Sequence, residues 1–293
     1  MTEKEPPQTI SFETILPSAM AQRAEAGGVT RAAMDPLSVF VLSVLAGAFV
    51  SFGAVFATTV GASGIPIGPG AATFPYGVVR LLTGIAFCAG LILVVVGGAE
   101  LFTGNNMLVM AWASGKVTTR AVLSNWAMVF VGNSIGAIAT AVLVFVSTQY
   151  TFGGGSVGLN ALTIASGKTA LNFLPAFTLG ILCNALVCLA VWMCYGARTT
   201  IDRVVTIVPP ISAFAAAGFE HSIANIYFIP IGLFIKTGAP ESFWISIGKT
   251  PIDFPSLTWE NFLANLIPVT LGNIVGGSVL VAAVYWFVYL RRK

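Results

Sequence analysis

The chain has 293 residues, of which 56% are hydrophobic and only 9% are charged. This composition excludes a soluble globular domain, in which about 25% of the residues are charged, and predicts a polytopic membrane protein. The formal net charge of +3 is small for so long a chain, and we expect no nucleic-acid partner.

The N-terminal segment, 1–35, is polar and lacks the apolar core of a cleavable signal peptide, so we expect the N-terminus to stay in the cytoplasm. Apolar residues recur there at helical spacing: Phe12, Ile15, Leu16, Ala19 and Met20. Gly27-Gly28 ends the pattern. The spacing predicts an amphipathic helix on the membrane surface, ahead of a membrane domain over 36–293.

The membrane domain contains six apolar stretches. A spanning helix needs about 20 mostly apolar residues, and four stretches meet this without interruption: 37–60, 120–147, 169–196 and 260–290. Two more stretches, 77–114 and 203–236, are interrupted, the first at Gly97-Gly98 and the second at Gly218-Phe219-Glu220-His221. In each, the part after the interruption is too short to span alone. We therefore predict an all-α bundle of six spans in which the second and fifth helices are broken.

The basic residues support this count, because short cytoplasmic loops carry the excess of Lys and Arg. With the N-terminus inside, ten of them fall on the cytoplasmic side: Lys4, Arg23, Arg31, Lys116, Arg120, Arg198, Arg203, Arg291, Arg292 and Lys293. Four fall outside: Arg80, Lys168, Lys236 and Lys249. Both termini are accordingly expected in the cytoplasm.

The two halves of the chain resemble each other. Residues 123–137 match 263–277 at six of fifteen positions with a constant offset of 140, and Gly98, Glu100 and Asn105 match Gly218, Glu220 and Asn225 at an offset of 120. A longer outer loop, around 237–258, accounts for the change of offset. Three spans per half force opposite insertion, so we predict an inverted repeat, about 36–148 and about 168–290, whose broken helices meet near the midplane and form the substrate site.

Three titratable residues lie within the breaks: Glu100, Glu220 and His221, the only histidine in the sequence. A titratable side chain inside the membrane is energetically unfavourable, so its presence predicts a functional site. Backbone amides freed at a half-helix start favour an anion. We therefore expect both glutamates to point away from the solute and to tie down backbone amides or neighbouring side chains. The imidazole would then be the titratable donor that faces the solute.

The four cysteines, Cys88, Cys183, Cys188 and Cys194, lie in apolar segments without metal-type spacing. We interpret them as small buried hydrophobes, and we expect neither a metal site nor a cofactor. Asn133 and Asn273 lie in Gly-Asn-x-x-Gly contexts, where small residues four apart let helices approach closely, and we interpret both as structural.

Four segments resemble the formate/nitrite transporter family, closest to its bacterial formate channels: Gly98–Asn105, Leu179–Met193, Gly218–Asn225 and Ile267–Gly276. The resemblance covers nearly the whole chain. It implies an aquaporin-like fold of six spans, a homopentamer with one pore in each protomer, and passage of small monovalent anions such as formate, nitrite or hydrosulfide across the bacterial inner membrane. It implies no enzymatic activity.

The resemblance also assigns residues to the pore. It makes His221 the central histidine, with Thr103 on the opposing break. Asn184 matches a pore-associated amide and Lys168 an outer-vestibule lysine. The cytoplasmic side of the histidine is narrowed by Phe87, Leu91 and Phe214. Residues around these, in the two breaks, support the site: Glu100, Leu101, Phe102, Glu220 and Asn225.

The residues themselves leave some of these roles open. Phe87 and Leu91 are four apart and share a helix face, which also suits ordinary packing. Lys168 follows a Gly/Ser-rich stretch, and a lysine in such a loop is usually only solvated. The N-terminal helix, which lies at the cytoplasmic mouth in the family, is expected either to anchor the protein to the membrane or to gate it.

We hypothesise that Lys168 draws anions into the outer vestibule and that His221, whose free pKa lies near neutrality, helps the anion cross as its protonated acid. The sequence does not separate formate from nitrite or hydrosulfide, nor a channel from a proton-coupled symporter. A neutral-solute channel of the aquaporin type lacks support, because the paired Asn-Pro-Ala breaks are absent. A membrane hydrolase would need a Gly-x-Ser-x-Gly turn, which no span contains.

Overall fold

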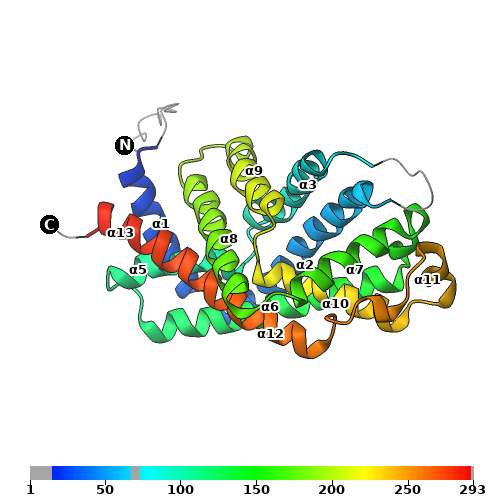
Figure 1. The fold of residues 1–293 in the computed structure, drawn as a ribbon. Helices are drawn as coiled ribbons and strands as arrows, with labels where there is room; N and C mark the ends of the chain where they lie inside the picture. Colours follow the sequence, from blue (N-terminus) through cyan, green and yellow to red (C-terminus); the bar gives the residue numbers. More distant parts are fainter. Residues whose placement is uncertain (1–14, 67–72, 292–293) are drawn as a thin grey trace, which may run out of the picture.

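The computed structural model describes residues 15–66 and 73–291, and over these residues it is helical, without a strand (Figure 1). Lys4 and Phe12 of the predicted N-terminal segment, and the terminal Arg292 and Lys293, lie outside the described residues. The helices are α1 Pro17–Ala32, α2 Pro36–Gly61, α3 Tyr76–Gly97, α4 Phe102–Asn105, α5 Val109–Ala113, α6 Thr119–Val146, α7 Ser156–Thr169, α8 Phe173–Cys194, α9 Thr200–Ala217, α10 Ser222–Gly238, α11 Glu241–Ile247, α12 Trp259–Ile274 and α13 Val284–Tyr289. A π-helical segment, Val275–Ala283, joins α12 to α13.

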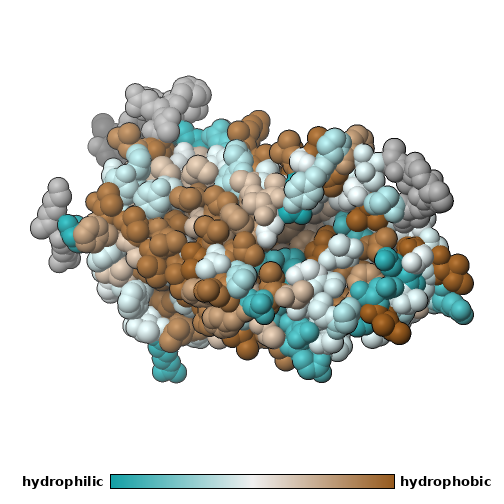
Figure 2. All heavy atoms as spheres, viewed as in Figure 1, coloured by the Kyte–Doolittle hydropathy of each residue, from teal (hydrophilic) through white to brown (hydrophobic). Residues whose placement is uncertain are grey.

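Six helical segments of the described chain are long and apolar enough to cross a membrane: Pro36–Gly64, Tyr76–Gly97, Thr119–Val146, Phe173–Cys194, Thr200–Ala217 and Trp259–Tyr289. The prediction of six spans is confirmed, and the chain is a multi-pass membrane protein. Figure 2 shows hydrophobic residues over most of one face of the molecule, as lipid or subunit contact requires. Hydrophilic residues gather toward the end that carries α11.

Both predicted interruptions are present, and a glycine makes each one. Gly98 ends α3 with φ 72° and Gly218 ends α9 with φ 80°, the left-handed conformation that residues with a Cβ rarely adopt. After each glycine the chain runs extended before a new helix begins at Phe102 or at Ser222. The first break continues into short helical pieces, α4 and α5, whereas the second continues into the longer α10.

An asparagine side chain holds the first break in place. The Oδ1 atom of Asn133 accepts a hydrogen bond from the backbone N–H of Phe102 at 2.9 Å. Its Nδ2 group donates to the carbonyl oxygens of Ser43 at 2.7 Å and Glu100 at 2.9 Å. One amide thus ties α6 to α2 and satisfies backbone groups that the interrupted helix leaves free.

Asn273 does the same for the second break. It accepts from the backbone N–H of Ser222 at 2.9 Å and donates to the carbonyl oxygens of Gly180 at 2.8 Å and Glu220 at 2.9 Å. The same bonds therefore recur in both halves at matching positions, which supports the predicted repeat and the structural role of the two asparagines. The opposite insertion of the two halves stays a prediction.

Glycines let the helices beside these asparagines approach closely. A Cβ on Gly136 of α6 would lie 2.0 Å from the carbonyl oxygen of Val44 on α2, and a Cβ on Gly276 would lie 2.2 Å from that of Ile181 on α8. No side chain fits at such distances. The contacts of α2 with α6, and of α8 with the π-helical segment that follows α12, are therefore backbone-to-backbone, as small residues four apart predict.

Helix α1 differs from its prediction. It does not end at Gly27-Gly28 but continues to Ala32. A glycine costs a helix about 1 kcal/mol relative to alanine, but a Cβ on Gly28 would lie 3.0 Å from Cβ of Ala111 on α5. Close packing against α5 therefore outweighs the low helix propensity of the two glycines.

Lys168 also differs from its prediction, because it lies in the last turn of α7 and not in a loop. The triple glycine, Gly153 to Gly155, adopts positive φ values and forms the turn, and Ser156 then begins the helix. Helix α7 has a buried face that packs against α10. Tertiary packing has overridden the Gly/Ser-rich composition.

Helix α1 is held by charged contacts at the end of the bundle where it meets α13 (Figure 1). Arg31 forms an ion pair with Glu100 in the first break, with 3.2 Å between Nε and Oε1. Lys116 pairs with Glu25, and Arg23 donates to the carbonyl oxygen of Tyr195 at 3.2 Å. The helix is thereby fixed against the first break.

The Glu25–Lys116 pair predicts a pH-dependent docking of α1. Burial alone would raise the pKa of Glu25, but hydrogen bonds with Lys116 and Ser114 and the charge of Lys116 outweigh it and hold this pKa below its ordinary value of 4.5. The pair therefore stabilises docking above pH 4.5, and the stabilisation disappears as the pH falls through the lowered pKa. The size of this stabilisation is at most about 1 kcal/mol, because Lys116 is half-exposed.

Hydrogen exchange of α1 tests this prediction. Exchange should be slower in the wild type than in Glu25→Gln above pH 4.5, and the two rates should become equal below it. A difference in rate that does not change with pH would contradict the prediction.

The helix contact at Gly136 predicts a steric defect. Gly136→Ala should destabilise the protein by about 1–3 kcal/mol, because the new methyl group collides with the backbone of α2. Gly77→Ala is the matched control, since a Cβ on Gly77 meets nothing within 4 Å, and it should stabilise by at most about 1 kcal/mol. Thermal unfolding in detergent measures both, and equal midpoints for the two variants would rule out the close contact.

Candidate functional site

His221 caps the N-terminus of α10 and meets the opposite break. Its Nδ1 atom accepts a hydrogen bond from the backbone N–H of Ala224 at 3.1 Å. Because that N–H can only donate, Nδ1 carries no proton, and the neutral ring carries its proton on Nε2. Nε2 lies 3.0 Å from the hydroxyl oxygen of Thr103, so the imidazole donates to Thr103. The hydroxyl proton of Thr103 is then available for another acceptor.

Phenylalanine rings surround this pair. Phe214 stacks on the His221 ring with 6.1 Å between centroids, and Phe87 meets Phe214 edge-on at 5.5 Å. Phe228 stacks on Phe87 at 6.3 Å. All are buried. The sequence analysis missed Phe228, although its position seven residues after His221 places it on the same face of α10.

A cavity of about 410 Å³ lies against one side of this site. Its lining includes His221, Phe87 and Phe214, together with Lys168, Glu220 and Arg80. The structure thus brings Lys168, predicted for the outer vestibule, to the same cavity as the central histidine.

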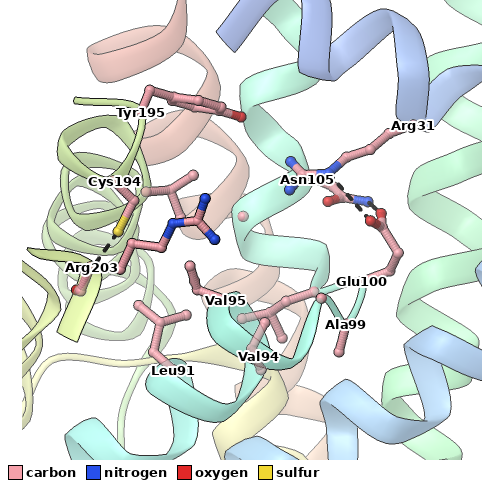
Figure 3. A pocket seen from close by; sticks show the side chains of 14 residues that line it. Arg31, Leu91, Val94, Val95, Ala99, Glu100, Asn105, Cys194, Tyr195 and Arg203 are labelled. Carbon is pink, nitrogen blue, oxygen red and sulfur yellow. Dashed lines mark hydrogen bonds and ion pairs between the residues drawn. The ribbon is translucent and has the colours of Figure 1, made fainter. Parts of the chain in front are cut away.

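A second cavity, of about 200 Å³, lies at the first break (Figure 3). It is lined by Leu91 and Leu101, by Glu100 of the break, and by Arg31 and Arg203. Leu91 lies one turn after Phe87 on α3, yet the two residues line different cavities. This turn of α3 therefore lies in the wall between the two cavities. Thr103 is fully buried and bonds to His221, which lines the larger cavity, so the Thr103–His221 hydrogen bond lies in the same wall.

Both glutamates are bound by side-chain donors. The carboxylate of Glu220 accepts from Lys168 Nζ at 2.7 Å and from Asn225 Nδ2 at 2.6 Å. Glu100 pairs with Arg31 and accepts from Asn105 Nδ2 at 2.6 Å. The sequence predicted that the glutamates bind backbone amides or neighbouring side chains, and the structure shows that neighbouring side chains hold both carboxylates. Their charge is neutralised where it is buried, as the interior requires.

Asn184 lies behind Thr103 and lines neither cavity. It is fully buried, and its Nδ2 group donates to the carbonyl oxygens of Thr103 at 3.3 Å and Asn273 at 2.7 Å. Phe102 is buried as well and packs edge-on against Phe130. These two residues thus support the first break from behind, and a direct role of Asn184 in the pore stays a prediction.

The comparisons with known proteins agree with the resemblance. The family model for the formate/nitrite transporter matches residues 18–287. The formate channel FocA of Escherichia coli (strain K12) is 44% identical over 96% of this chain and 97% of its own length. The formate channel FocA of Haemophilus influenzae is 36% identical over 94% of both chains.

Two solved structures share the fold. A structure named "Pentameric formate channel with formate bound" has a TM-score of 0.80 and 44% identity, and the match covers 87% of this chain and 98% of that one. Another, named "FNT family ion channel", has a TM-score of 0.73 and 28% identity, and the match covers 92% of this chain and 98% of that one. The predicted all-α fold of six spans is confirmed.

The Lys168–Glu220 pair predicts a stability defect. Glu220→Gln leaves the ammonium of Lys168, whose side chain is only 14% exposed, without an anionic partner, and should destabilise the protein by about 3–5 kcal/mol. Adding Lys168→Met should recover much of this loss. Thermal unfolding in detergent tests both, with Glu241→Gln at an exposed position of α11 as the control. If Glu220→Gln melts like the wild type, the pair contributes nothing to the fold.

Proposed function

The chain belongs to the formate/nitrite transporter family, and we propose that it passes formate across a membrane through a pore in each protomer of a homopentamer. The observation that carries the proposal is the 44% identity to a formate channel over nearly the whole chain. The similar structure that is named as a pentameric formate channel supports both the substrate and the assembly. Nitrite or hydrosulfide is the alternative substrate.

We assign the protein to the bacterial inner membrane, with a cytoplasmic segment over 1–35 and a channel domain over 36–293. Bacterial relatives support the location. Helices α1 and α13 meet at one end of the bundle (Figure 1), which agrees with termini on one side of the membrane. The distribution of Lys and Arg makes that side the cytoplasm.

The pore would run from the cavity of Lys168, past the Thr103–His221 pair, to the cavity of Arg31. The rings of Phe87 and Phe214 at the barrier offer no hydrogen bonds. A bare anion that meets them loses its water shell without replacement, whereas a neutral weak acid passes at lower cost. Polar donors at the barrier therefore decide whether formate crosses.

Thr103 and His221 supply those donors. In the resting tautomer, the Nε2–H of His221 donates to the hydroxyl oxygen of Thr103, and the Thr103 hydroxyl can itself donate to a carboxylate oxygen. If His221 transferred its Nε2 proton to formate, Nδ1 would have to take up another proton, and Nδ1 accepts from Ala224. His221 thus acts first as a hydrogen-bond donor, and proton coupling requires release of the Ala224 N–H.

This mechanism predicts different results for two variants in proteoliposomes over pH 5–8. His221→Phe should reduce formate flux by a factor of about 10 or more, because the barrier loses its donor. Asn is a good helix cap and its amide group can donate a hydrogen bond, so His221→Asn should keep the fold and part of the formate flux. Because asparagine does not titrate, the flux of this variant should not depend on pH.

Nitrite, hydrosulfide and glycerol are measured in the same vesicles. Formate should be transported faster than glycerol, and faster glycerol movement without anion flux would favour a neutral-solute channel. If His221→Phe retains both the flux and the pH profile of the wild type, the histidine has no part in permeation.

A further inference from the structure

The cavity at the first break joins three charged residues and a tyrosine from parts of the chain far apart in sequence. Arg31 comes from α1, Glu100 from the break, Tyr195 from the residue that follows α8, and Arg203 from the first turn of α9. In Figure 3 the guanidinium groups of Arg31 and Arg203 point toward the same space from opposite sides. None of the pore roles discussed so far includes Arg203.

The two arginines differ in their partners. Arg31 is engaged by Glu100 at 3.2 Å and by the hydroxyl of Tyr195. Over residues 15–66 and 73–291, no carboxylate and no hydrogen-bond acceptor pairs with the guanidinium of Arg203. The hydrogen bonds of Arg203 use its backbone: its N–H donates to the carbonyl oxygen of Thr199 at 3.3 Å, and its carbonyl oxygen accepts from the thiol of Cys194 at 4.0 Å. Its guanidinium is therefore available for a ligand.

The charges of the cavity lining leave one positive charge unbalanced. Arg31 and Arg203 carry two positive charges and Glu100 carries one negative charge. Apolar side chains, including Leu91 and Val94, form much of the remaining wall. A cleft with low-dielectric walls and charge of one sign concentrates ions of the other sign.

The cavity on the other side of the barrier has the same charges in a different arrangement. Lys168 and Arg80 carry two positive charges and Glu220 carries one negative charge, and Lys168 pairs with Glu220. Arg80, however, donates to the carbonyl oxygens of Ala215 and Ala216, both at 2.7 Å. Its guanidinium is fixed at the C-terminus of α9, whereas that of Arg203 is not fixed by the described residues.

We propose that Arg203 is the binding group of a docking site for a small carboxylate in the cavity at the first break. A guanidinium presents two parallel N–H groups that match the two oxygens of a carboxylate. The inference rests on the proposed function, because it takes formate as the carboxylate and places it in the cavity that Leu91 lines, before the barrier of Phe87, Phe214 and the Thr103–His221 pair. The site serves entry from the side of α1, opposite to Lys168.

The test uses the full-length protein in planar bilayers, with formate added to one side at a time. Arg203→Gln should raise the half-saturating formate concentration for entry from the α1 side by about three- to tenfold. Entry from the other side should be unchanged, and Arg203→Lys should recover part of the loss. Added salt should weaken entry in the wild type more than in Arg203→Gln, because it screens the exposed charge.

Arg120→Gln is the matched control, because Arg120 is an exposed arginine in the first turn of α6 outside both cavities. It should leave both half-saturating concentrations unchanged. If the wild type passes formate and Arg203→Gln behaves like Arg120→Gln on both sides, the docking site is overturned while the proposed function stands.

If the wild type passes no formate, the proposed function fails, and direct binding decides the docking site. Line broadening of ¹³C-formate by the detergent-solubilised protein should then be lost in Arg203→Gln and retained in Arg120→Gln. Equal broadening by all three proteins would overturn the site independently of transport.

Discussion

A helix that is interrupted inside a membrane must have its released backbone groups hydrogen-bonded by the protein, because lipid offers no partner. In this chain two asparagine side chains meet that requirement, Asn133 for the first break and Asn273 for the second. Each amide uses both its donor and its acceptor. Through these bonds Thr103 and His221, one from each break, come within hydrogen-bond distance of each other.

The same arrangement explains how the site tolerates charge. Each break carries a glutamate that would repel an anion, and each glutamate is neutralised by a cation from the helix that precedes the first span of its own half, Arg31 for Glu100 and Lys168 for Glu220. These buried pairs hold α1 and α7 against the breaks. Lys168 therefore contributes an ion pair to its cavity and not a bare ammonium.

The two cavities carry the same charges, but the arginine in each is bonded differently. Arg80 is bound to the end of α9 on one side of the barrier, whereas the guanidinium of Arg203 has no partner among the described residues on the other. The barrier itself is thin, since Phe87 and Leu91, one turn apart on α3, line different cavities. The Thr103–His221 pair lies in the wall between the two cavities.

The sequence by itself determined the six spans, the two breaks and the paired asparagines, because these depend on local patterns: apolar length, glycine, and residues that recur at a constant offset. It misjudged α1 and the environment of Lys168, where packing against α5 and α10 overrides the helix propensity of Gly27-Gly28 and of the stretch before Lys168. Only the tertiary structure decided which cation neutralises which glutamate, that Asn184 lies behind Thr103, and that the guanidinium of Arg203 lines a cavity without a partner among the described residues. Such contacts join residues far apart in the chain, and their distances and angles are fixed only when the helices have packed.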